Sequence, residues 1–251
     1  MTVKEFYRAL CTLIPRELGC EWDKDGMSVC PDPDREVSRV LVALDATAAV
    51  VDKAIAEGYD LIFTHHPMLW SGLKSVCADD HDGAKVIKLC RAGVSAMAFH
   101  TRIDAAEGGV NDMLAQLVGL EEIEIAGEER IMRVGNLQAP VEAAVFAACV
   151  KEALGAPAVV CSDAGLPVRR VAVVGGSGKD EIGVAMAAGA DTFLTGELKY
   201  SQLSEPRGIN LLVAGHFHTE NPICKRLCAL VNEIDPTVHT DITQSCKATI
   251  I

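Results

Sequence analysis

Residues 60–67 read Asp60-Leu61-Ile62-Phe63-Thr64-His65-His66-Pro67, and this apolar run, which stops on two histidines, guides the interpretation of the whole chain. A short apolar run between Gly58 and a proline is typical of a buried strand in a parallel sheet. Ligands of such sheets bind at the carboxyl ends of the strands. We therefore expect His65 and His66 to lie at the rim of a binding crevice, which suits a metal ion.

The His-His pair also has a simpler interpretation, in which one ring is buried and hydrogen-bonded and the other is solvated. Taken alone, the pair favours that structural role. A second cluster argues for a metal site, because Gly215-His216-Phe217-His218-Thr219-Glu220 also follows an apolar run, Leu211-Leu212-Val213-Ala214. Two predicted strands thus deliver imidazole and carboxylate groups to a rim.

The composition is that of an ordinary globular protein, with 251 residues, 49% of them hydrophobic, and a net charge of -12. The acidic balance argues against broad nucleic-acid binding, which requires excess Lys and Arg. A small anionic substrate stays compatible, because bound metal adds positive charge locally. The N-terminus MTVKEFYRAL lacks the apolar core of a signal peptide, and no apolar stretch is as long as a membrane span. We expect a cytoplasmic protein with no membrane partner.

The ten cysteines are spread from Cys11 to Cys246 without a CxxC pair, which indicates free thiols in a reducing compartment. Cys224 and Cys228 stand four residues apart on a predicted helix and could hold a metal. The alternative is that they pack on the apolar face of that helix, since cysteine is among the most buried residue types.

An internal repeat organises the chain. Residues 39–64 align with residues 170–195 at a constant offset of 131, and the identities include Ala54, Ala56, Gly58, Asp60 and Thr64 with Ala185, Ala187, Gly189, Asp191 and Thr195. Further on, His100 and Asp104 align with His216 and Glu220 at an offset of 116. Each half is expected to run strand, helix, strand, helix, strand.

We therefore predict an α/β protein of two related halves, with mixed sheets flanked by helices and a dinuclear metal site between strand ends. The first half is expected at residues 1–120 and carries the His-His pair. The second half is expected at residues 121–251, and its C-terminal part, from about residue 209, returns to complete the metal site. Residues 68–83 are predicted to be a long loop, a type of segment that often acts as a functional lid.

Candidate ligands collect at the predicted strand ends, namely His65, His66, His100, Asp104, His216 and Glu220, with Glu197 and His218 nearby. Imidazoles and carboxylates without thiolates are ligands that zinc, iron or manganese select. Such a set exceeds the need of one tetrahedral ion and suits two divalent ions with bridging carboxylates. Asp104 and Glu220, at matching places in the repeat, are the natural bridges. Two such ions would lower the pKa of a shared water and supply hydroxide for hydrolysis.

The segment Val171-Ala172-Val173-Val174-Gly175-Gly176-Ser177-Gly178-Lys179 has two interpretations. A strand, a glycine-rich turn and a helix start could cradle a phosphate on backbone N–H groups. The spacing of the glycines, however, matches neither a Walker A loop nor GxGxxG. Alternatively, the glycines form a tight turn that lets a helix pack closely on the sheet.

These motifs resemble those of the GTP cyclohydrolase I type 2 homologues, also described as Nif3-like or dinuclear-metal-centre proteins. The matching residues span nearly the whole chain and include Trp22-Asp23, Gly26, Leu44-Asp45, residues 60–67, His100-Thr101-Arg102-Ile103-Asp104-Ala105-Ala106, Gly109-Val110-Asn111-Asp112, Gly175-Gly176-Ser177-Gly178, Gly189-Ala190-Asp191, Thr195-Gly196-Glu197, Gly215-His216 and Glu220. The resemblance implies metal ligands at His65, His66, Asp104, His216 and Glu220. It also implies a ring-shaped homo-oligomer, often a hexamer, with sites facing an interior cavity. Arg102 and the extra imidazole of His218 depart from the family pattern.

The leading functional hypothesis is a two-metal hydrolase of a purine nucleotide or related heterocycle, with attack on an amidine-like carbon such as C8 of GTP. The alternatives are a non-catalytic metal-binding or regulatory protein and a two-metal phosphoesterase. We expect His100 to be a catalytic group and not a ligand, because the other five residues already leave each ion one open position for water. A neutral imidazole there could hydrogen-bond a ligand or shuttle a proton.

Overall fold

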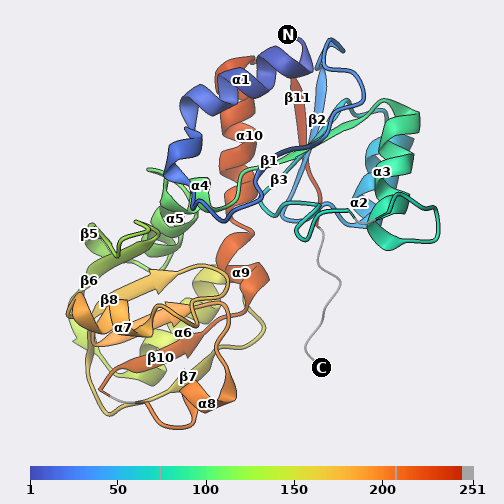
Figure 1. Cartoon of the computed structure of the whole chain (residues 1–251). Coiled ribbons are helices and arrows are strands. Elements are labelled where there is room, and N and C mark those ends of the chain that lie inside the picture. The colour runs from blue at the N-terminus through green and yellow to red at the C-terminus, as the bar shows by residue number, and fades with distance from the viewer. Residues whose placement is uncertain (74, 207, 245–251) are drawn as a thin grey trace. The chain divides into compact units, whose positions relative to one another are not determined.

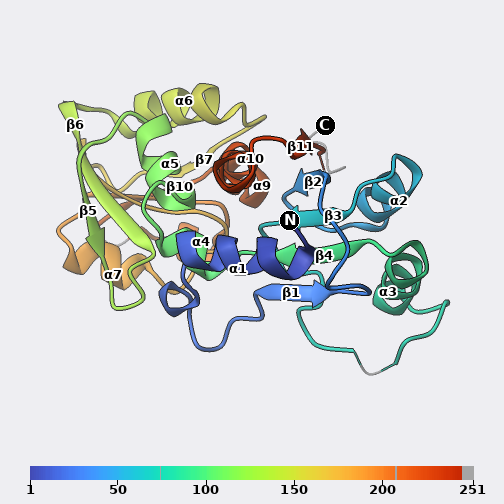
Figure 2. The same cartoon turned by 90° about the horizontal axis from the view of Figure 1, so that it is seen from above.

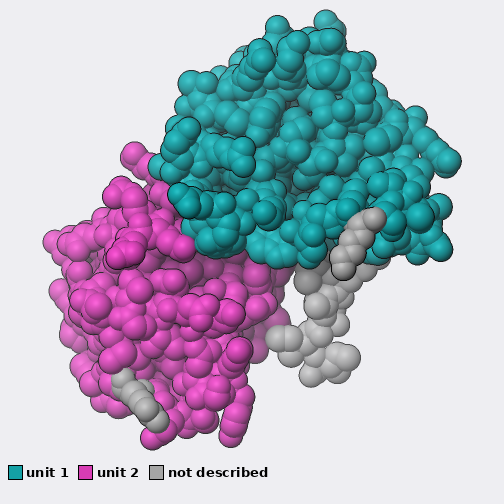
Figure 3. All heavy atoms as spheres, in the orientation of Figure 1, with its two compact units in different colours: residues 1–103, 223–247 teal, residues 104–222, 248–251 magenta. Residues whose placement is uncertain are grey.

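The structure, a computed structural model, describes residues 1–73, 75–206 and 208–244. These residues form two compact units, which Figure 3 distinguishes by colour. Unit 1 comprises Met1–Ile103 together with the segment that begins at Ile223, and unit 2 comprises Asp104–Pro222. In the described part of the chain, no helix has the length and apolarity that crossing a membrane requires.

Unit 1 is built on a five-stranded mixed sheet with the strand order β1-β4-β3-β2-β11. Strands β2, β3, β4 and β11 are parallel, and β1 runs antiparallel beside β4. The strand bounds are β1 Gly26–Val29, β2 Arg39–Ala43, β3 Leu61–Thr64, β4 Ser95–Ala98 and β11 His239–Ile242. All residues of β3 and β4 are buried, which explains why residues 61–63 form an unbroken apolar run.

Helices cover both faces of this sheet (Figures 1 and 2). On one face α10 packs against β2, β3 and β11 and against α1, and on the other α2 packs beside α3. The bounds are α1 Val3–Leu13, α2 Ala48–Ala56, α3 His81–Ala92, α10 Ile223–Ile234 and a 3₁₀ turn at Arg16–Leu18. The core under α2 and α3 contains Leu41, Val50, Ile62, Leu89 and Ala96.

Capping residues place the helix ends of unit 1. Thr2 opens α1 in a capping box with Glu5, and Gly93 ends α3 in the left-handed conformation with φ 69°. The Asp80 side chain accepts a hydrogen bond from the Gly83 N–H at 2.7 Å, so α3 begins at His81, inside the segment expected to be a loop. The short polar side chain of Asp80 thus ends the loop earlier than the apolar pattern predicts.

Unit 2 contains a six-stranded mixed sheet in the order β5-β6-β8-β9-β10-β7. Strands β8, β9 and β10 are parallel, whereas β5, β6 and β7 pair antiparallel with their neighbours. The strand bounds are β5 Glu121–Ala126, β6 Met132–Val141, β7 Val160–Ser162, β8 Val168–Val174, β9 Thr192–Thr195 and β10 Asn210–Val213. The strands are thus arranged as the sequence predicts, with parallel and antiparallel pairs in one sheet.

Alternate residues of these strands face two separate cores. One core joins Val171 and Leu194 to α5 and α6, and the other joins Ala172 and Phe193 to α7. The helix bounds are α5 Val110–Leu117, α6 Ala143–Leu154, α7 Ile182–Ala187, α8 Tyr200–Leu203 and α9 His216–Glu220. The short helix α4, Thr101–Ala105, carries the chain from unit 1 into unit 2.

The internal repeat is present in the two sheets. The order β1-β4-β3-β2 in unit 1 matches the order β7-β10-β9-β8 in unit 2, and β1 and β7 are the antiparallel members. Ala43 pairs with Thr64 in one sheet and Val174 with Thr195 in the other, which keeps the offset of 131. The prediction of two related α/β halves with mixed sheets is confirmed.

The third strand of the repeat shifts the sequence alignment by one residue. Thr64 pairs with Ala98, whereas Thr195 pairs with Val213, so the structural offset there is 115 and not 116. The place of His100 is therefore taken in unit 2 by Gly215, and the expected equivalence of His100 with His216 is wrong. The alignment matched side-chain types, but backbone hydrogen bonds decide which residues occupy equivalent places.

The compact units divide the chain differently from the expected halves 1–120 and 121–251. Unit 2 already includes α5, because Leu114 and Ala115 pack in the core of its sheet. Helix α10 and strand β11, from the C-terminal part, belong to unit 1, where β11 pairs with β2. The apolar face of each helix decides which sheet it joins, and sequence position does not.

Two equivalent aspartates join neighbouring strands of the repeat. Asp60 accepts the N–H groups of Ser38 and Arg39, and Asp191 accepts those of Arg169 and Arg170, at 2.8–3.0 Å. Asp60 also accepts two hydrogen bonds from the Arg35 guanidinium, the shorter at 2.7 Å. Burial by itself would raise the pKa of Asp60, but the hydrogen bonds from Ser38, Arg35 and Arg39 outweigh it and lower the pKa.

Asp60→Asn should lower the free energy of unfolding by about 1–3 kcal/mol at neutral pH, because charge-assisted hydrogen bonds are lost. The stabilisation by Asp60 is present above its unfolded-state pKa of about 3.9 and is lost as the pH falls through the lower folded-state pKa. The variant should therefore lose less stability in acid than the wild type. Urea unfolding followed by circular dichroism measures both effects.

The matched variant is Asp191→Asn, since hydrogen bonds to Asp191 come from uncharged donors. This variant should lower the free energy of unfolding less than Asp60→Asn does. It should also change the pH dependence of that free energy less. An equal decrease in the free energy of unfolding in the two variants would contradict the stabilisation attributed to the hydrogen bonds from the Arg35 guanidinium.

Candidate metal centre

Three histidines of unit 1 lie together at the carboxyl ends of two neighbouring strands. His65 and His66 follow β3, and His100 follows β4 after Phe99. One ligand nitrogen from each ring lies within 4.8 Å of the others. His65 is completely buried, and His66 and His100 are partly buried. The parallel strands end on one edge of the sheet, and this is why residues far apart in sequence form one cluster.

Each of these rings is oriented by a hydrogen bond at Nδ1. The pairs are His65 with the Phe99 carbonyl at 3.0 Å, His66 with Asp45 Oδ1 at 2.7 Å and His100 with Asp23 Oδ1 at 2.9 Å. An oxygen acceptor requires the proton on Nδ1, so a neutral ring keeps its lone pair on Nε2. Metal-binding imidazoles are commonly supported in this way by a carboxylate or carbonyl. The cluster therefore fits a divalent transition metal.

A second imidazole–carboxylate group lies in unit 2, on α9. His216 Nδ1 lies 3.0 Å from Glu197 Oε1, and His216 Nε2 lies 3.0 Å from Glu220 Oε2. The two α9 residues are four apart and so share one face of the helix. Glu220 is buried against Gly176, where an added Cβ would overlap the Glu220 carboxylate. This part of unit 2 offers one nitrogen and one oxygen donor of the kind that transition metals bind.

Asp104 and His218, the remaining sequence-predicted residues, lie on the short helices α4 and α9. Asp104 lies on α4, is 9% exposed, and its backbone carbonyl accepts a hydrogen bond from Asn111 Nδ2 at 3.2 Å. The His218 ring packs edge-on against Phe217. Neither residue joins, within the described chain, a group of three ligand atoms as close as 4.8 Å. The bridging role of Asp104 stays a prediction.

Asp23 has no role in the sequence-based prediction, yet it anchors His100. Its Oδ1 accepts the His100 Nδ1 hydrogen bond, and its Oδ2 accepts the Thr101 N–H at 2.8 Å and the Thr101 hydroxyl. Burial by itself would raise the pKa of Asp23, but the hydrogen bonds from His100 and Thr101 outweigh it and hold the pKa well below its usual range. Asp23 is therefore ionised at neutral pH and keeps the proton of His100 on Nδ1.

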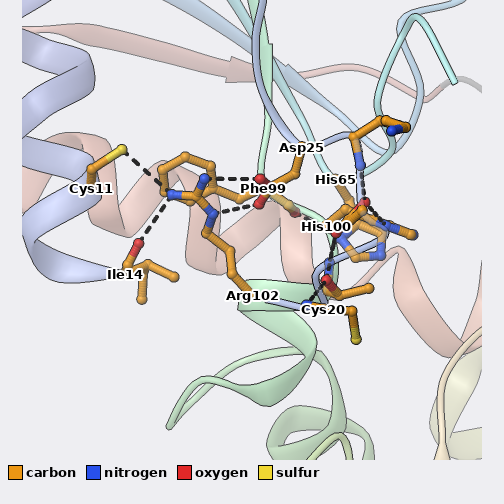
Figure 4. Close-up of polar contacts among 11 residues, drawn as sticks. Cys11, Ile14, Cys20, Asp25, His65, Phe99, His100 and Arg102 are labelled. Carbon is orange, nitrogen blue, oxygen red and sulfur yellow. Dashed lines mark hydrogen bonds and ion pairs between the residues drawn. The ribbon is translucent and has the colours of Figure 1, made fainter. Parts of the chain in front are cut away.

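Arg102 has a structural role beside the cluster. Its buried guanidinium forms an ion pair with Asp25, donates to the Ile14 carbonyl at 3.2 Å and lies 4.1 Å from the centroid of the Phe99 ring. Figure 4 shows the guanidinium pointing away from His100. The ion pair fastens the loop that carries Asp25 to the start of α4, and the stacking on Phe99 adds a cation–π contact.

The glycine-rich turn at residues 175–178 uses its N–H groups within the fold. The bonds run from Gly175 to Asn111 Oδ1 at 2.7 Å, from Gly176 to Thr219 Oγ1 at 3.1 Å and from Gly178 to Thr195 Oγ1 at 3.0 Å. Helix α7 begins only at Ile182, so no helix N-terminus lies at the turn. These contacts favour the tight-turn interpretation over a phosphate cradle.

Cys224 and Cys228 pack along α10. Burial raises the pKa of the Cys224 thiol to about 12 and also raises the pKa of Cys228. Protonated thiols are poor metal ligands, which favours packing over metal binding for this pair. The nine cysteines in the described part of the chain are free thiols.

Comparison with known proteins decides the family. A family model described as Duf34/NIF3 (NGG1p interacting factor 3) matches residues 1–249. The chain belongs to the DUF34/NIF3 family. A relative from Streptomyces coelicolor, named GTP cyclohydrolase 1 type 2 homolog, is 36% identical over 262 residues, covering 99% of this chain and 92% of the relative. A Nostoc relative of the same name is 35% identical and covers 80% of each chain.

Solved structures show the same DUF34/NIF3 fold. Staphylococcus aureus hypothetical protein SA1388 has a TM-score of 0.88 and 25% identity, covering 100% of this chain and 99% of that one. A Bacillus cereus protein related to NIF3 also has a TM-score of 0.88, at 23% identity, covering 100% and 99% of the two chains. The family resemblance inferred from the sequence motifs is thereby confirmed.

Of the carboxylates that orient the imidazoles, Asp23 and Asp45 carry no role in the sequence-based prediction, and Glu197 is named there only as lying near the candidate ligands. Asp45 follows β2 and Glu197 follows β9, so both acids stand at strand ends, as the histidines do. Asp23 precedes β1, and no repeat or spacing connects it with His100. An acid at the end of a strand that neighbours a histidine-bearing strand is the signal that could have identified Asp45 and Glu197.

Gly176→Ala should lower the free energy of unfolding by about 1–3 kcal/mol. Gly176 has φ 65°, and an added Cβ would displace the Glu220 carboxylate. The matched variant is Gly183→Ala in α7, where a Cβ meets no atom within 4 Å. It should raise the stability by about 0.5–1 kcal/mol, because alanine favours helix. Urea unfolding measures the free energy of unfolding of both variants. Equal changes would contradict the close approach of the Gly176 backbone to the Glu220 carboxylate.

Proposed function

We propose that this DUF34/NIF3 protein is a metal-dependent hydrolase that binds two divalent transition-metal ions through His65, His66, Asp104, His216 and Glu220. The observation that carries the proposal is the orientation of the imidazoles. His65 and His66 each have Nδ1 engaged by an oxygen, which places the lone pair of the neutral ring on Nε2, whereas His216 has a carboxylate oxygen at each ring nitrogen, from Glu197 at Nδ1 and from Glu220 at Nε2. An oxygen at the second ring nitrogen is the support that metal-binding imidazoles commonly have.

The donor chemistry of the chain fits zinc, iron or manganese. Neutral imidazole and carboxylate are ligands that these ions accept, and the thiols of α10 are held protonated by burial. Glu220 adds a buried carboxylate, an oxygen donor that these ions accept, 3.0 Å from His216 Nε2. When bound, such ions lower the pKa of water and so supply hydroxide at neutral pH.

His100 has the placement of a proton-transfer group. Asp23 fixes the proton on His100 Nδ1, so Nε2 can accept a proton from a reacting group and return it to a leaving group. We place His100 outside the ligand set, because a further protein ligand would close the position that water needs. His100 also lies close to the ligand nitrogens of His65 and His66.

The proposed substrate is a purine nucleotide or a related heterocycle, in line with the name carried by the curated relatives. Metal-reconstituted protein incubated with a nucleotide panel tests this. Formate release would support ring opening of the base. Phosphate release would instead favour a two-metal phosphoesterase, and metal binding without turnover would favour a metal-storage or regulatory role. The resemblance further supports a cytoplasmic homohexamer, which light scattering in solution tests.

Protein purified anaerobically should carry up to two transition-metal ions per chain by elemental analysis. Asp104→Ala and Glu220→Ala should lose both ions, because a bridging carboxylate serves both. His218→Ala is the matched control and should lose little metal, since its ring packs on Phe217. Equal metal loss in all three variants would show that the bridging carboxylates are wrongly assigned. A wild-type protein that binds no ion at micromolar metal concentration would contradict the proposal as a whole.

His100→Ala should keep most of its metal and lose hydrolytic activity by about a hundredfold or more, the usual effect of removing a general acid or base. Asp23→Asn should lower the rate less and alter its pH profile, because the amide changes the tautomer preference of His100. Metal analysis and rate measurements on the same samples separate the two roles. Metal-free His100→Ala would place His100 among the ligands.

A further inference from the structure

Two tryptophans, the only two in the chain, flank the histidine cluster of unit 1. Trp22 is 52% exposed and Trp70 is 47% exposed, and their ring centroids lie 6.1 Å apart. Both rings also contact His100 edge-on, at centroid distances of 6.5 and 5.4 Å. Single exposed apolar residues are ordinary, but two half-exposed indoles in contact beside a reactive imidazole indicate a binding surface.

The loop that carries Trp22 is fastened on both sides of the indole. Asp23 binds His100 and Thr101, and Asp25 forms the buried ion pair with Arg102. The loop is therefore held against three consecutive residues that follow β4. A ring on a segment fixed in this way loses little conformational freedom when a ligand stacks on it, so less of the contact energy is spent on ordering.

Trp70 is positioned by the residues that precede it. Met68 is buried in the core of unit 1, and Leu69 packs against the same core. Residues 71–73, which follow Trp70, are exposed. Trp70 thus stands where the chain leaves the core after the His-His pair, which fixes the start of its side chain beside His100.

The charges around Trp22 bear on which ligand the rings would accept. A cavity of about 350 Å³ is lined by Arg16, Glu17, Gly19, Cys20, Glu21, Asp23 and Asp25. Four of these side chains are carboxylates and one is a guanidinium. Glu21 and Asp23, the neighbours of Trp22 in sequence, both border the cavity. The ion pair with Arg102 offsets the charge of Asp25, and Glu17, Glu21 and Asp23 still outnumber Arg16. Away from any bound metal, these carboxylates would repel a polyphosphate chain but not a neutral or cationic ring.

We propose that Trp22 and Trp70 bind a planar heteroaromatic ring by stacking and present it to His100, and that the preferred ligand is a base or nucleoside without a polyphosphate chain. This inference rests on the proposed function and narrows its substrate class. Base stacking on aromatic side chains tolerates many rings, so charge and not ring identity distinguishes the preferred ligands.

Intrinsic fluorescence tests the proposal directly, because Trp22 and Trp70 are the only indoles. Guanosine and GTP are the probes, added to the full-length protein as purified. Guanosine should quench the emission to saturation and bind more tightly than GTP. Trp22→Ala and Trp70→Ala should each weaken guanosine binding by about tenfold, read from the remaining indole. Trp22→Phe and Trp70→Phe keep an aromatic ring and should weaken binding less.

Tyr200→Ala is the matched control, since it removes an 85% exposed aromatic ring from unit 2 and should leave guanosine binding unchanged. Circular dichroism verifies that every variant is folded. Unchanged guanosine affinity in both alanine variants would overturn the proposal, as would tighter binding of GTP than of guanosine. Dissociation of an oligomer with unchanged guanosine affinity would identify the pair as a subunit contact and also overturn it.

The test separates this inference from the proposed hydrolase function. Guanosine binding that depends on both tryptophans, in a protein that holds no metal, would support the stacking site and reject the hydrolase. Metal-dependent hydrolysis with an unchanged KM in the alanine variants would support the hydrolase and reject the stacking site.

Discussion

The hydrogen bond between His100 Nδ1 and Asp23 Oδ1, at 2.9 Å, connects the parts of unit 1 on which the proposed ligand binding depends. It sets the tautomer of His100, satisfies a buried carboxylate and holds the loop that carries Trp22 at the end of β4. Without His100 and Thr101, the buried charge of Asp23 would be costly, so the loop and the strand end stabilise each other. One carboxylate therefore couples the position of the imidazole to the position of the indole.

The repeat shows how one strand arrangement can supply different chemical groups. At the offset of 131, His65 corresponds to Gly196 and His66 to Glu197. A side chain at Gly196 would collide with the Gly176 carbonyl and the backbone of His216, so unit 2 has no room for an imidazole there. Glu197 instead orients His216. The first copy thus presents a pair of imidazoles, and the second presents one imidazole held by a carboxylate.

Membership of the DUF34/NIF3 family establishes the fold and leaves the reaction to be argued from the site, because one fold can support several chemistries. The side chains favour metal-assisted hydrolysis through their donor atoms and their orientation. The surroundings of Trp22 add a separate constraint, since their negative charge opposes a polyphosphate. A substrate that satisfies both constraints is a heterocycle with little negative charge near its ring.

The sequence by itself determined the strand end before His65 and His66 and the repeat, because these depend on patterns within one or two elements. Only the tertiary structure decided the one-residue shift in the third strand, the sheet that α10 and β11 join, and the pairing of Asp23 with His100 across 77 residues. The contact between Trp22 and Trp70 was also decided only by the tertiary structure. Such contacts depend on how distant segments pack and on backbone hydrogen bonding, and neither leaves a periodic trace in the sequence.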